Sequence, residues 1–240
     1  MKKFKLLSIL LFVILFQFIF YPNEAALVIA TELQVVDENK YIALTFDDGP
    51  CSSLTPQLID ALKTYNAKAT FFLLGNMVKS NPDIVKMIYS NGNEIGSHTY
   101  SHPNLIYLSD NRINSELQST AELIMSITGS YPTLFRPPYG EHNQNIDNIA
   151  MAYNTPIILW NVDTLDWLYK DANHVYNHIS SNLNDGNVIL LHDIHPTSVE
   201  AALRILQDYS EKGYKFVTVS ELFKIKNIVL SSGVSYCGIP

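Results

Sequence analysis

Two aspartates stand side by side at the end of an apolar stretch, in the segment TFDDGP at residues 45–50. Adjacent carboxylates repel each other, so Asp47 and Asp48 need either a cation or separate chemical tasks. His98 and His102 lie four residues apart in SHTYSH, a spacing at which both imidazoles can reach one ion. Two histidines and one carboxylate form a recurrent catalytic zinc site. The sequence therefore predicts a metal held by the histidines and one aspartate, with the other aspartate left as a base.

Further reactive side chains follow other apolar stretches that we expect to be strands. They are Arg136 and Tyr139 in RPPYG, Asp163, Asp166 and Trp167 in VDTLDW, and His192 and Asp193 in LLHD. The carboxyl ends of parallel strands meet at one edge of a sheet or barrel, so these groups should gather on one rim with the aspartates and histidines. A histidine beside carboxylates at such a rim is suited to acid–base work. The pattern indicates an active site.

The elements that must position these residues alternate along the chain. Strands are expected at 41–46, 69–74, 94–97, 133–135, 157–162, 188–191 and 214–219. Helical spacing is found at 55–66, 81–91, 110–128, 145–153, 171–183 and 197–211, before a short last helix that Ser220 should cap. Continuous apolar strands separated by amphipathic helices predict an α/β fold with a parallel sheet, either open or closed into a barrel. The tail at 227–240 shows neither period.

The composition limits the class of protein. The 240-residue chain is 47% hydrophobic and 16% charged, which is typical of a globular protein. About 210 residues beyond the leader described below suit a single domain. The net charge is −7 and basic runs are missing, so nucleic acid is excluded as a partner. We expect a monomer.

Residues 1–30 have the character of an export segment. Lys2, Lys3 and Lys5 precede an apolar run over residues 6–21, which is short for a bilayer span of about 17–25 residues. We expect a cleaved signal peptide, with a weak cleavage site at 28–30, or an uncleaved N-terminal membrane anchor. A linker over 31–40 follows. Either alternative places the rest of the chain outside the cytoplasm, secreted or held at the outer face of the membrane.

The chain has two cysteines, Cys51 and Cys237. In an oxidising compartment they can form a disulfide between the tail and the loop after TFDDGP, or remain two free thiols. Both alternatives stay open. With only two cysteines, a cysteine-rich zinc site is excluded.

The segments TFDDGP, SHTYSH, RPPYG, DTLDW and LLHD, in this order, resemble the polysaccharide deacetylase family, the family 4 carbohydrate esterases built on the NodB homology domain. The stretches ATFFLLG, NEIGSH and GYKFVTVSELF are also similar, so the resemblance covers residues 41–223. It implies a distorted (β/α) barrel of about seven parallel strands in a single catalytic domain over 41–226, with 227–240 as a C-terminal tail. The similarity is to peptidoglycan N-acetylglucosamine deacetylases in particular.

The resemblance also implies roles for the matching residues. One divalent metal, usually zinc but with cobalt or another ion allowed, would be bound by Asp48, His98 and His102. The implied catalytic residues are the base Asp47, the arginine that orients it, Arg136, the acid His192, and the aspartate that tunes it, Asp166. We expect Arg136 to keep the pKa of Asp47 low and Asp166 to raise that of His192. Substrate-binding positions are Tyr139, whose backbone N–H would help hold the oxyanion, and Trp167, Leu190 and Pro138.

The expected activity is hydrolysis of N-acetyl groups on N-acetylglucosamine in a cell-surface polysaccharide, with peptidoglycan first and chitooligosaccharides or O-acetylated xylan as alternatives. A second class is a catalytically silent glycan-binding protein. Such proteins usually lack the base or a metal ligand, whereas Asp47, Asp48 and both histidines are present here. A third class is a magnesium-dependent phosphatase using the aspartate pair. The two histidines argue against it, because magnesium prefers oxygen ligands.

Overall fold

The computed structural model describes residues 39–239. The expected leader and nearly all of the expected linker lie outside these residues. None of the helices within them is both long enough and apolar enough to span a bilayer.

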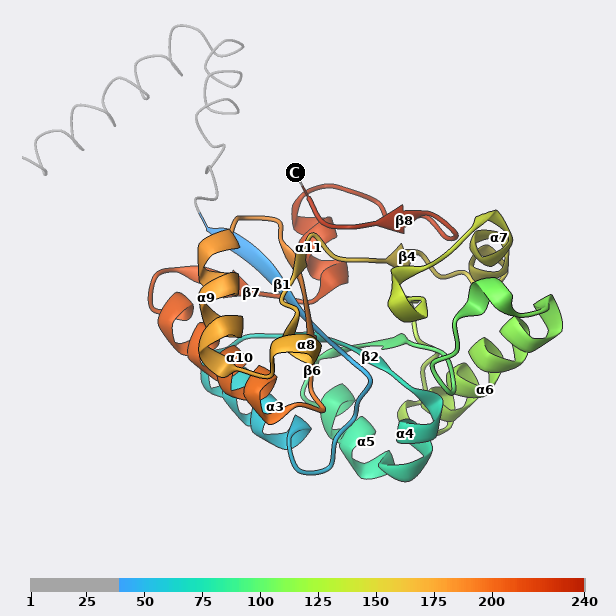
Figure 1. Ribbon diagram of the computed structural model, residues 1–240, viewed down its shortest axis with the longest axis horizontal. Coiled ribbons are helices and arrows are strands. Elements are labelled where there is room, and N and C mark those ends of the chain that lie inside the picture. The colour runs from blue at the N-terminus through green and yellow to red at the C-terminus, as the bar shows by residue number, and fades with distance from the viewer. Residues whose placement is uncertain (1–38, 240) are drawn as a thin grey trace, which may run out of the picture. The chain divides into compact units, whose positions relative to one another are not determined.

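The centre of the fold is a parallel sheet in the order β3-β2-β1-β6-β5, with β7 pairing the first residues of β1 (Figure 1). The bounds of its strands are β1 Lys40–Asp47, β2 Thr70–Leu73, β3 Glu94–Ser97, β5 Val162–Asp163, β6 Val188–His192 and β7 Tyr214–Phe216. In register, Asp47 of β1 lies opposite His192 of β6, and Leu73 of β2 lies opposite Ser97 of β3. The carboxyl ends of these strands therefore meet, as the sequence predicted.

A second, two-stranded sheet pairs β4 Ile157–Ile158 with β8 Ser235–Tyr236, again in parallel. Phe135 joins the two sheets through single bridges to Ser97 and Ile157. The strand expected at 133–135 is thus reduced to one bridging residue. Strand β8 lies in the tail, where the sequence predicted no strand.

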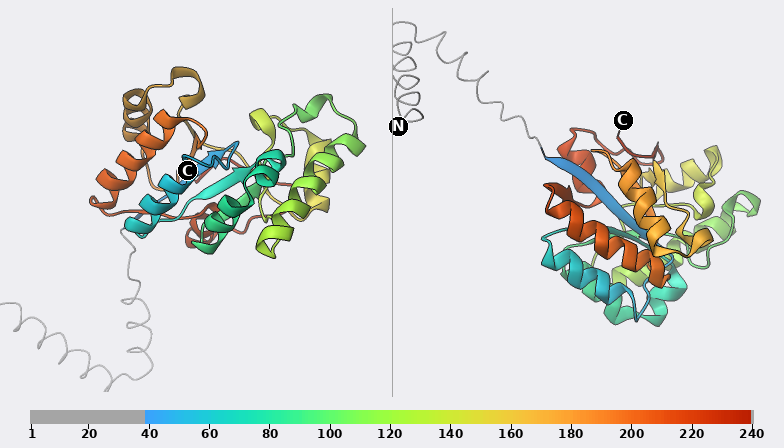
Figure 2. Two further views of the ribbon diagram at one scale, coloured as in Figure 1. Left: turned by 90° about the horizontal axis from the view of Figure 1, so that it is seen from below. Right: turned by 60° about the vertical axis from the view of Figure 1, so that its left-hand side comes forward.

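Helices pack against the strands, as the predicted α/β architecture requires. Their bounds are α3 Thr55–Thr64, α4 Gly75–Ser80, α5 Pro82–Ser90, α6 Asp110–Thr128, α7 Gln144–Ala152, α8 Asp166–Tyr169, α9 Ala172–Asn182, α10 Pro196–Ser210 and α11 Val219–Ile225, with 3-10 turns η1 Leu105–Tyr107 and η2 Pro138–Gly140. Seen from below, α9 and α10 lie on one side of the strands and α6 on the other (Figure 2).

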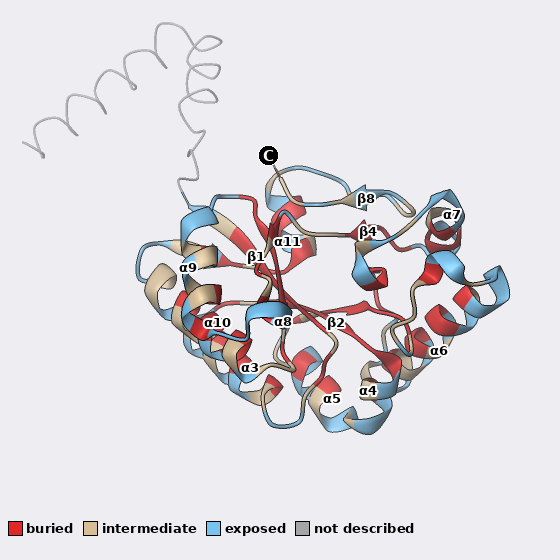
Figure 3. Cartoon of the chain, viewed as in Figure 1, coloured by how far each residue is buried: buried red, intermediate tan, exposed pale blue. Residues whose placement is uncertain are grey.

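The side chains of β1 alternate between two environments, because successive residues of a strand point to opposite faces. Ile42, Leu44 and Phe46 belong to the large apolar core under the covering helices. Ala43 faces the other way, into a smaller core with α11. Both cores are closed to solvent, and most strands of the central sheet are buried along most of their length, whereas β8 is not (Figure 3). Asp47 is four residues after Ala43 on the same strand, so its side chain points to the same face as Ala43. It therefore lies on the side of the sheet away from the large apolar core.

The two cysteines are free thiols in the structure, Cys51 half-buried and Cys237 exposed. Of the alternatives that the sequence left open, the structure has the unpaired one.

Candidate active site

Three side chains at the rim form a group that can hold a metal ion. The Oδ1 atom of Asp48 lies 3.6 Å from Nε2 of His98 and 3.6 Å from Nε2 of His102. Two ligands that each bind a tetrahedral ion at about 2.0–2.1 Å lie about 3.4 Å apart. Oδ1 of Asp48 is also buried and has no hydrogen-bond partner in the described part of the chain. The spacing and the unsatisfied oxygen both fit a divalent metal.

The backbone and the neighbours of His98 turn it toward this group. Its Nδ1 lies 2.7 Å from the carbonyl oxygen of Arg136, so Nδ1–H donates there and Nε2 presents a lone pair to the site. Burial lowers the pKa of His98 to about 3, which keeps the imidazole neutral, as metal ligation requires. His102 is half-buried, and its ring meets the Tyr139 ring edge-on at 4.7 Å.

Asp47 is bound to a buried arginine. Its Oδ1 accepts a hydrogen bond from Nη1 of Arg136 at 2.7 Å, while its Oδ2 lies 3.6 Å from Nε2 of His98. The guanidinium is fixed by further bonds to the Thr45 hydroxyl and to the carbonyl oxygens of residues 158 and 159. It also packs over the Phe72 ring at 4.0 Å. One carboxylate oxygen of Asp47 is thus held, and the other faces the metal-binding atoms.

The pKa of Asp47 differs from the expectation. Burial raises it above the usual value for aspartate, and Arg136 lowers it by less than burial raises it. The family resemblance implied that an arginine would lie nearby, but it did not indicate that the carboxyl group would be almost fully removed from water. A raised pKa is compatible with a base, because a stronger base accepts protons more readily.

His192 faces the metal-binding group from β6 and is paired with a second aspartate. Its Nδ1 lies 2.8 Å from Oδ1 of Asp166, and its backbone N–H donates to Oδ2 of the same residue. Burial alone would lower the pKa of His192, but the hydrogen bond and the charge of Asp166 outweigh it and raise the pKa to about 9. The imidazole is therefore charged at neutral pH, as the sequence led us to expect.

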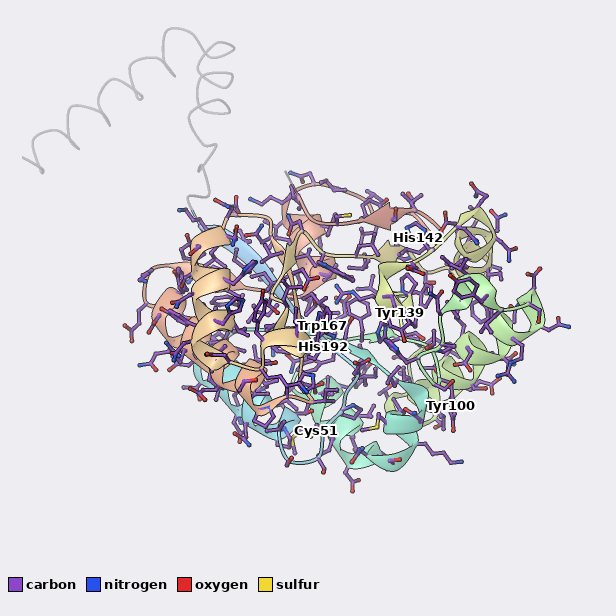
Figure 4. All side chains as sticks on the ribbon, viewed as in Figure 1. Cys51, Tyr100, Tyr139, His142, Trp167 and His192 are labelled. Carbon is purple, nitrogen blue, oxygen red and sulfur yellow. The ribbon has the colours of Figure 1, made fainter. Side chains whose placement is uncertain are left out.

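These groups line a cavity of about 420 Å³. Its walls include Tyr139, Trp160, Asp163, Trp167 and Leu190 in addition to the aspartate pair and three histidines. Figure 4 shows Trp167 beside His192 near the centre of the molecule, with Tyr139 to one side. The cavity brings together most of the residues singled out from the sequence. Arg136 and Asp166 lie behind its wall, and Pro138 is buried and does not line it.

The structure shows what Asp193, which the sequence placed at the rim without a defined task, does there. The fully buried carboxylate of Asp193 accepts a short hydrogen bond from the Thr55 hydroxyl, which in turn accepts the N–H of Cys51. A Cβ on Gly49 would lie 2.2 Å from Oδ1 of Asp193, so only glycine fits there. Burial raises the pKa of Asp193 to about 7. The contacts of Asp193 and Thr55 with Gly49 and Cys51 fix the loop that carries Asp48.

A further buried carboxylate, Glu116 of α6, contacts the turn between His98 and His102. Its signal in the sequence was a charged residue on the apolar face of a helix, in register with Ile113, Leu117 and Thr120.

Comparison with known proteins agrees with this geometry. Residues 34–158, just over half of the chain, match the family model for polysaccharide deacetylase. The chain belongs to the polysaccharide deacetylase family. Among its relatives in this family is the peptidoglycan-N-acetylglucosamine deacetylase PgdA of Listeria monocytogenes serotype 1/2a. The two are 42% identical over 80% of this chain and 41% of PgdA.

Other members of the polysaccharide deacetylase family are similarly close. The peptidoglycan-N-acetylmuramic acid deacetylase PdaC of Bacillus subtilis is 38% identical over 85% of this chain and 43% of PdaC. A solved structure described as T48 deacetylase with substrate is 37% identical, with a TM-score of 0.77 over 82% of this chain and 96% of that one. The chain thus spans less than half the length of PgdA and PdaC, and matches nearly all of a solved deacetylase chain. The predicted distorted-barrel fold is confirmed by this likeness.

Proposed function

We propose that the protein is a metal-dependent hydrolase that removes N-acetyl groups from N-acetylglucosamine residues of a cell-surface polysaccharide, and that this polysaccharide is peptidoglycan. The proposal is carried by one cavity that contains a possible metal-binding triad, Asp48, His98 and His102. The same cavity contains Asp47, which is paired with a cation, and His192, which is paired with an anion. Amide hydrolysis needs a base for water and an acid for the leaving nitrogen, and the cavity offers one of each.

The triad would hold the metal, and zinc is the first candidate because two imidazoles and one carboxylate suit it. When bound, such an ion polarises the acetyl carbonyl and lowers the pKa of water. Cobalt or another divalent ion can occupy the same ligands.

Asp47 is the proposed base. Its Oδ2 is the oxygen that Arg136 leaves free, and it points toward the triad, so it can accept the proton of the attacking water. Arg136 keeps the carboxylate in one orientation throughout. The backbone N–H of Tyr139 is the proposed donor to the oxyanion that develops on the carbonyl, a contact worth about 2.7–4 kcal/mol where it has been measured.

His192 is the proposed acid. With its pKa raised to about 9 it carries a proton at neutral pH, which it can give to the departing nitrogen. Asp166 holds Nδ1, so Nε2 is the nitrogen that donates. Trp167 and Leu190 line the cavity and would enclose the acetyl methyl group. Pro138 does not line the cavity, and its proposed role is to shape the loop that carries Tyr139.

Peptidoglycan is the proposed substrate because PgdA and PdaC are both named for its deacetylation, the first at N-acetylglucosamine and the second at N-acetylmuramic acid. Since this polymer lies outside the cell membrane, we propose that the catalytic domain at 41–226 works there. Residues 1–30 would serve as its signal peptide or membrane anchor. We also propose that it acts as a monomer.

The test is acetate release by the purified chain from N-acetylglucosamine oligomers, purified peptidoglycan and O-acetylated xylan, each with metal-stripped and zinc-restored protein. Zinc-dependent release that is fastest from peptidoglycan would support the proposal. Faster release from the oligomers or from xylan would move the substrate to chitin-like or xylan polymers. Zinc binding without release from any of the three would favour a silent glycan-binding protein.

A further inference from the structure

The turn between His98 and His102 is held from outside the cavity by a single carboxylate. Glu116 of α6 is only 7% exposed. Its Oε2 accepts the backbone N–H groups of Tyr100 and Ser101, at 2.9 and 2.8 Å, and its Oε1 accepts the Ser101 hydroxyl at 2.9 Å. All three of these hydrogen bonds go to Tyr100 and Ser101, which lie between the two histidines in the chain.

The turn itself has an unfavourable backbone. Thr99 and His102, the residues that flank Tyr100 and Ser101, have φ angles of +69° and +61°. Residues other than glycine rarely adopt such angles, which persist only where the surrounding structure holds the backbone in place. The N–H groups of Tyr100 and Ser101 also need acceptors, and their hydrogen bonds to Glu116 are partly buried. Glu116 supplies one acceptor atom for both, and so stabilises the conformation that carries His102.

Helix α4 holds the same turn from the other side. The N–H groups of Gly75 and Asn76 donate to the carbonyl oxygens of Thr99 and Tyr100, both at 3.0 Å. A Cβ on Gly75 would lie 2.5 Å from the Tyr100 ring, so α4 and the turn are in the closest contact that glycine allows. Tyr100 accordingly lies against α4 (Figure 4). The turn is therefore clamped between α4 and α6.

We infer that Glu116 is a positioning residue of the metal site, which sets where His102 lies relative to Asp48 and His98. This inference rests on the proposed metal-binding role of those three residues. Glu116 does not line the cavity, so a substrate or metal bound there would not be expected to touch it. It acts through the backbone of the turn, since releasing Tyr100 and Ser101 would let His102 leave the position 3.6 Å from Asp48.

The experiment is titration of the metal-stripped protein with zinc, followed by calorimetry, and with cobalt, followed by its visible absorption. Three variants separate reach from charge. Glu116→Ala removes the acceptor, Glu116→Asp keeps the charge but shortens the side chain, and Glu116→Gln keeps the reach and an acceptor oxygen. We expect zinc affinity to fall by about 10–100-fold in the alanine variant, the usual effect of losing a group that orients a metal ligand. The aspartate variant should also bind weakly, with an altered cobalt spectrum, and the glutamine variant should bind nearly as the parent does.

Glu94 provides a matched control. Its carboxylate is half-buried, and it accepts hydrogen bonds from the hydroxyl of Thr70 and from the backbone N–H and hydroxyl of Ser220. These bonds join β3 to α11. Glu94→Ala should lower the melting temperature without changing zinc affinity. The comparison separates a loss of stability, which both alanine variants can show, from a loss of metal affinity, expected only for Glu116.

Parental zinc affinity in folded Glu116→Ala or Glu116→Asp would overturn the inference, and so would a glutamine variant as weak as the alanine variant. If Glu116→Ala fails to fold, the aspartate and glutamine pair decides. Zinc titration needs no substrate, so its result is independent of whether the protein releases acetate.

Discussion

At the scale of single residues, the proposed base and the proposed acid have partners of opposite charge. Asp47 is bound to a cation, Arg136, and His192 is bound to an anion, Asp166. Both pairs are largely buried, so each partner acts through a short hydrogen bond with little screening by water. Each pair can therefore be tested by changing the partner and leaving the reactive group in place.

Replacing Asp166 with asparagine should move the alkaline limit of activity. Asp166 raises the pKa of His192 to about 9, so the protonated acid persists up to that pH and is lost above it. Without the carboxylate, burial lowers the pKa and only the charges of Asp47 and Asp48 still raise it, so the alkaline limb of kcat/KM should move toward acid by at least about one pH unit. A pH–rate profile of both proteins measures this. An unmoved alkaline limb would show that His192 is not the group that titrates there.

Replacing Arg136 with lysine should reduce activity while the positive charge is retained. The guanidinium donates four hydrogen bonds, to Thr45, Asp47 and two carbonyl oxygens, and an ammonium group cannot reproduce that planar arrangement. Loss of one hydrogen bond to a charged group costs about 1.5–3 kcal/mol, so kcat should fall at least about tenfold. The measurement is kcat with zinc saturating. A parental kcat would mean that only the charge of Arg136 matters.

At the scale of elements, the apolar runs and helical periods were sufficient to predict most of the sheet and its covering helices. The strands around 41–46, 94–97 and 188–191 and the helix at 110–128 were found within a residue or so. Helix α4 and strand β8 were missed, because six-residue and two-residue elements carry too little periodicity to be recognised. Most of the cavity residues were predictable because they follow strands, whereas Trp160 was not singled out and Leu190 was named only through the family resemblance. The supports Glu116 and Thr55 were not assigned, because their partners come from distant turns and depend on the packing of whole helices.

The start of α11 gives a prediction at this scale. The sequence suggested Ser220 as its cap, but the cap is Thr218, which accepts the N–H of Glu221 while the Glu221 carboxylate accepts the N–H of Thr218. Thr218→Ala should lower the free energy of unfolding by about 1 kcal/mol, or the melting temperature by about 2–4 °C. Glu221→Gln, which keeps an acceptor, should have a smaller effect. Thermal unfolding checks both, and an unchanged melting temperature in Thr218→Ala would contradict the assigned cap.

At the scale of the whole molecule, the C-terminal segment is connected to the active site through the backbone. The N–H groups of Ile157 and Leu159 donate to the carbonyl oxygens of Val234 and Tyr236, at 2.9 and 2.8 Å. The segment 157–159 is held by these two hydrogen bonds. Its carbonyl oxygens at residues 158 and 159 accept hydrogen bonds from Arg136. The segment after residue 226 thus supports the arginine that orients Asp47.

Deleting residues 227–240 should therefore lower both the melting temperature and kcat. The deletion leaves the N–H groups of Ile157 and Leu159 without their partners and uncovers Phe223, against which the Tyr236 ring packs at 5.3 Å. Tyr236→Phe keeps the strand pairing and the ring, so it should retain kcat. Thermal unfolding and steady-state kinetics with zinc provide the comparison. A truncated protein with parental kcat would show that Arg136 does not need this support.

The most direct test of the account compares the parent protein with Asp47→Asn in two assays, zinc titration and acetate release from peptidoglycan. Asp47 is the proposed base and is not one of the three proposed ligands. We expect the variant to bind zinc, because Asp48, His98 and His102 remain, and to release no measurable acetate, whereas the parent should release acetate only with zinc. Release by the zinc-loaded variant at the parental rate, or release by the metal-stripped parent, would contradict this expectation.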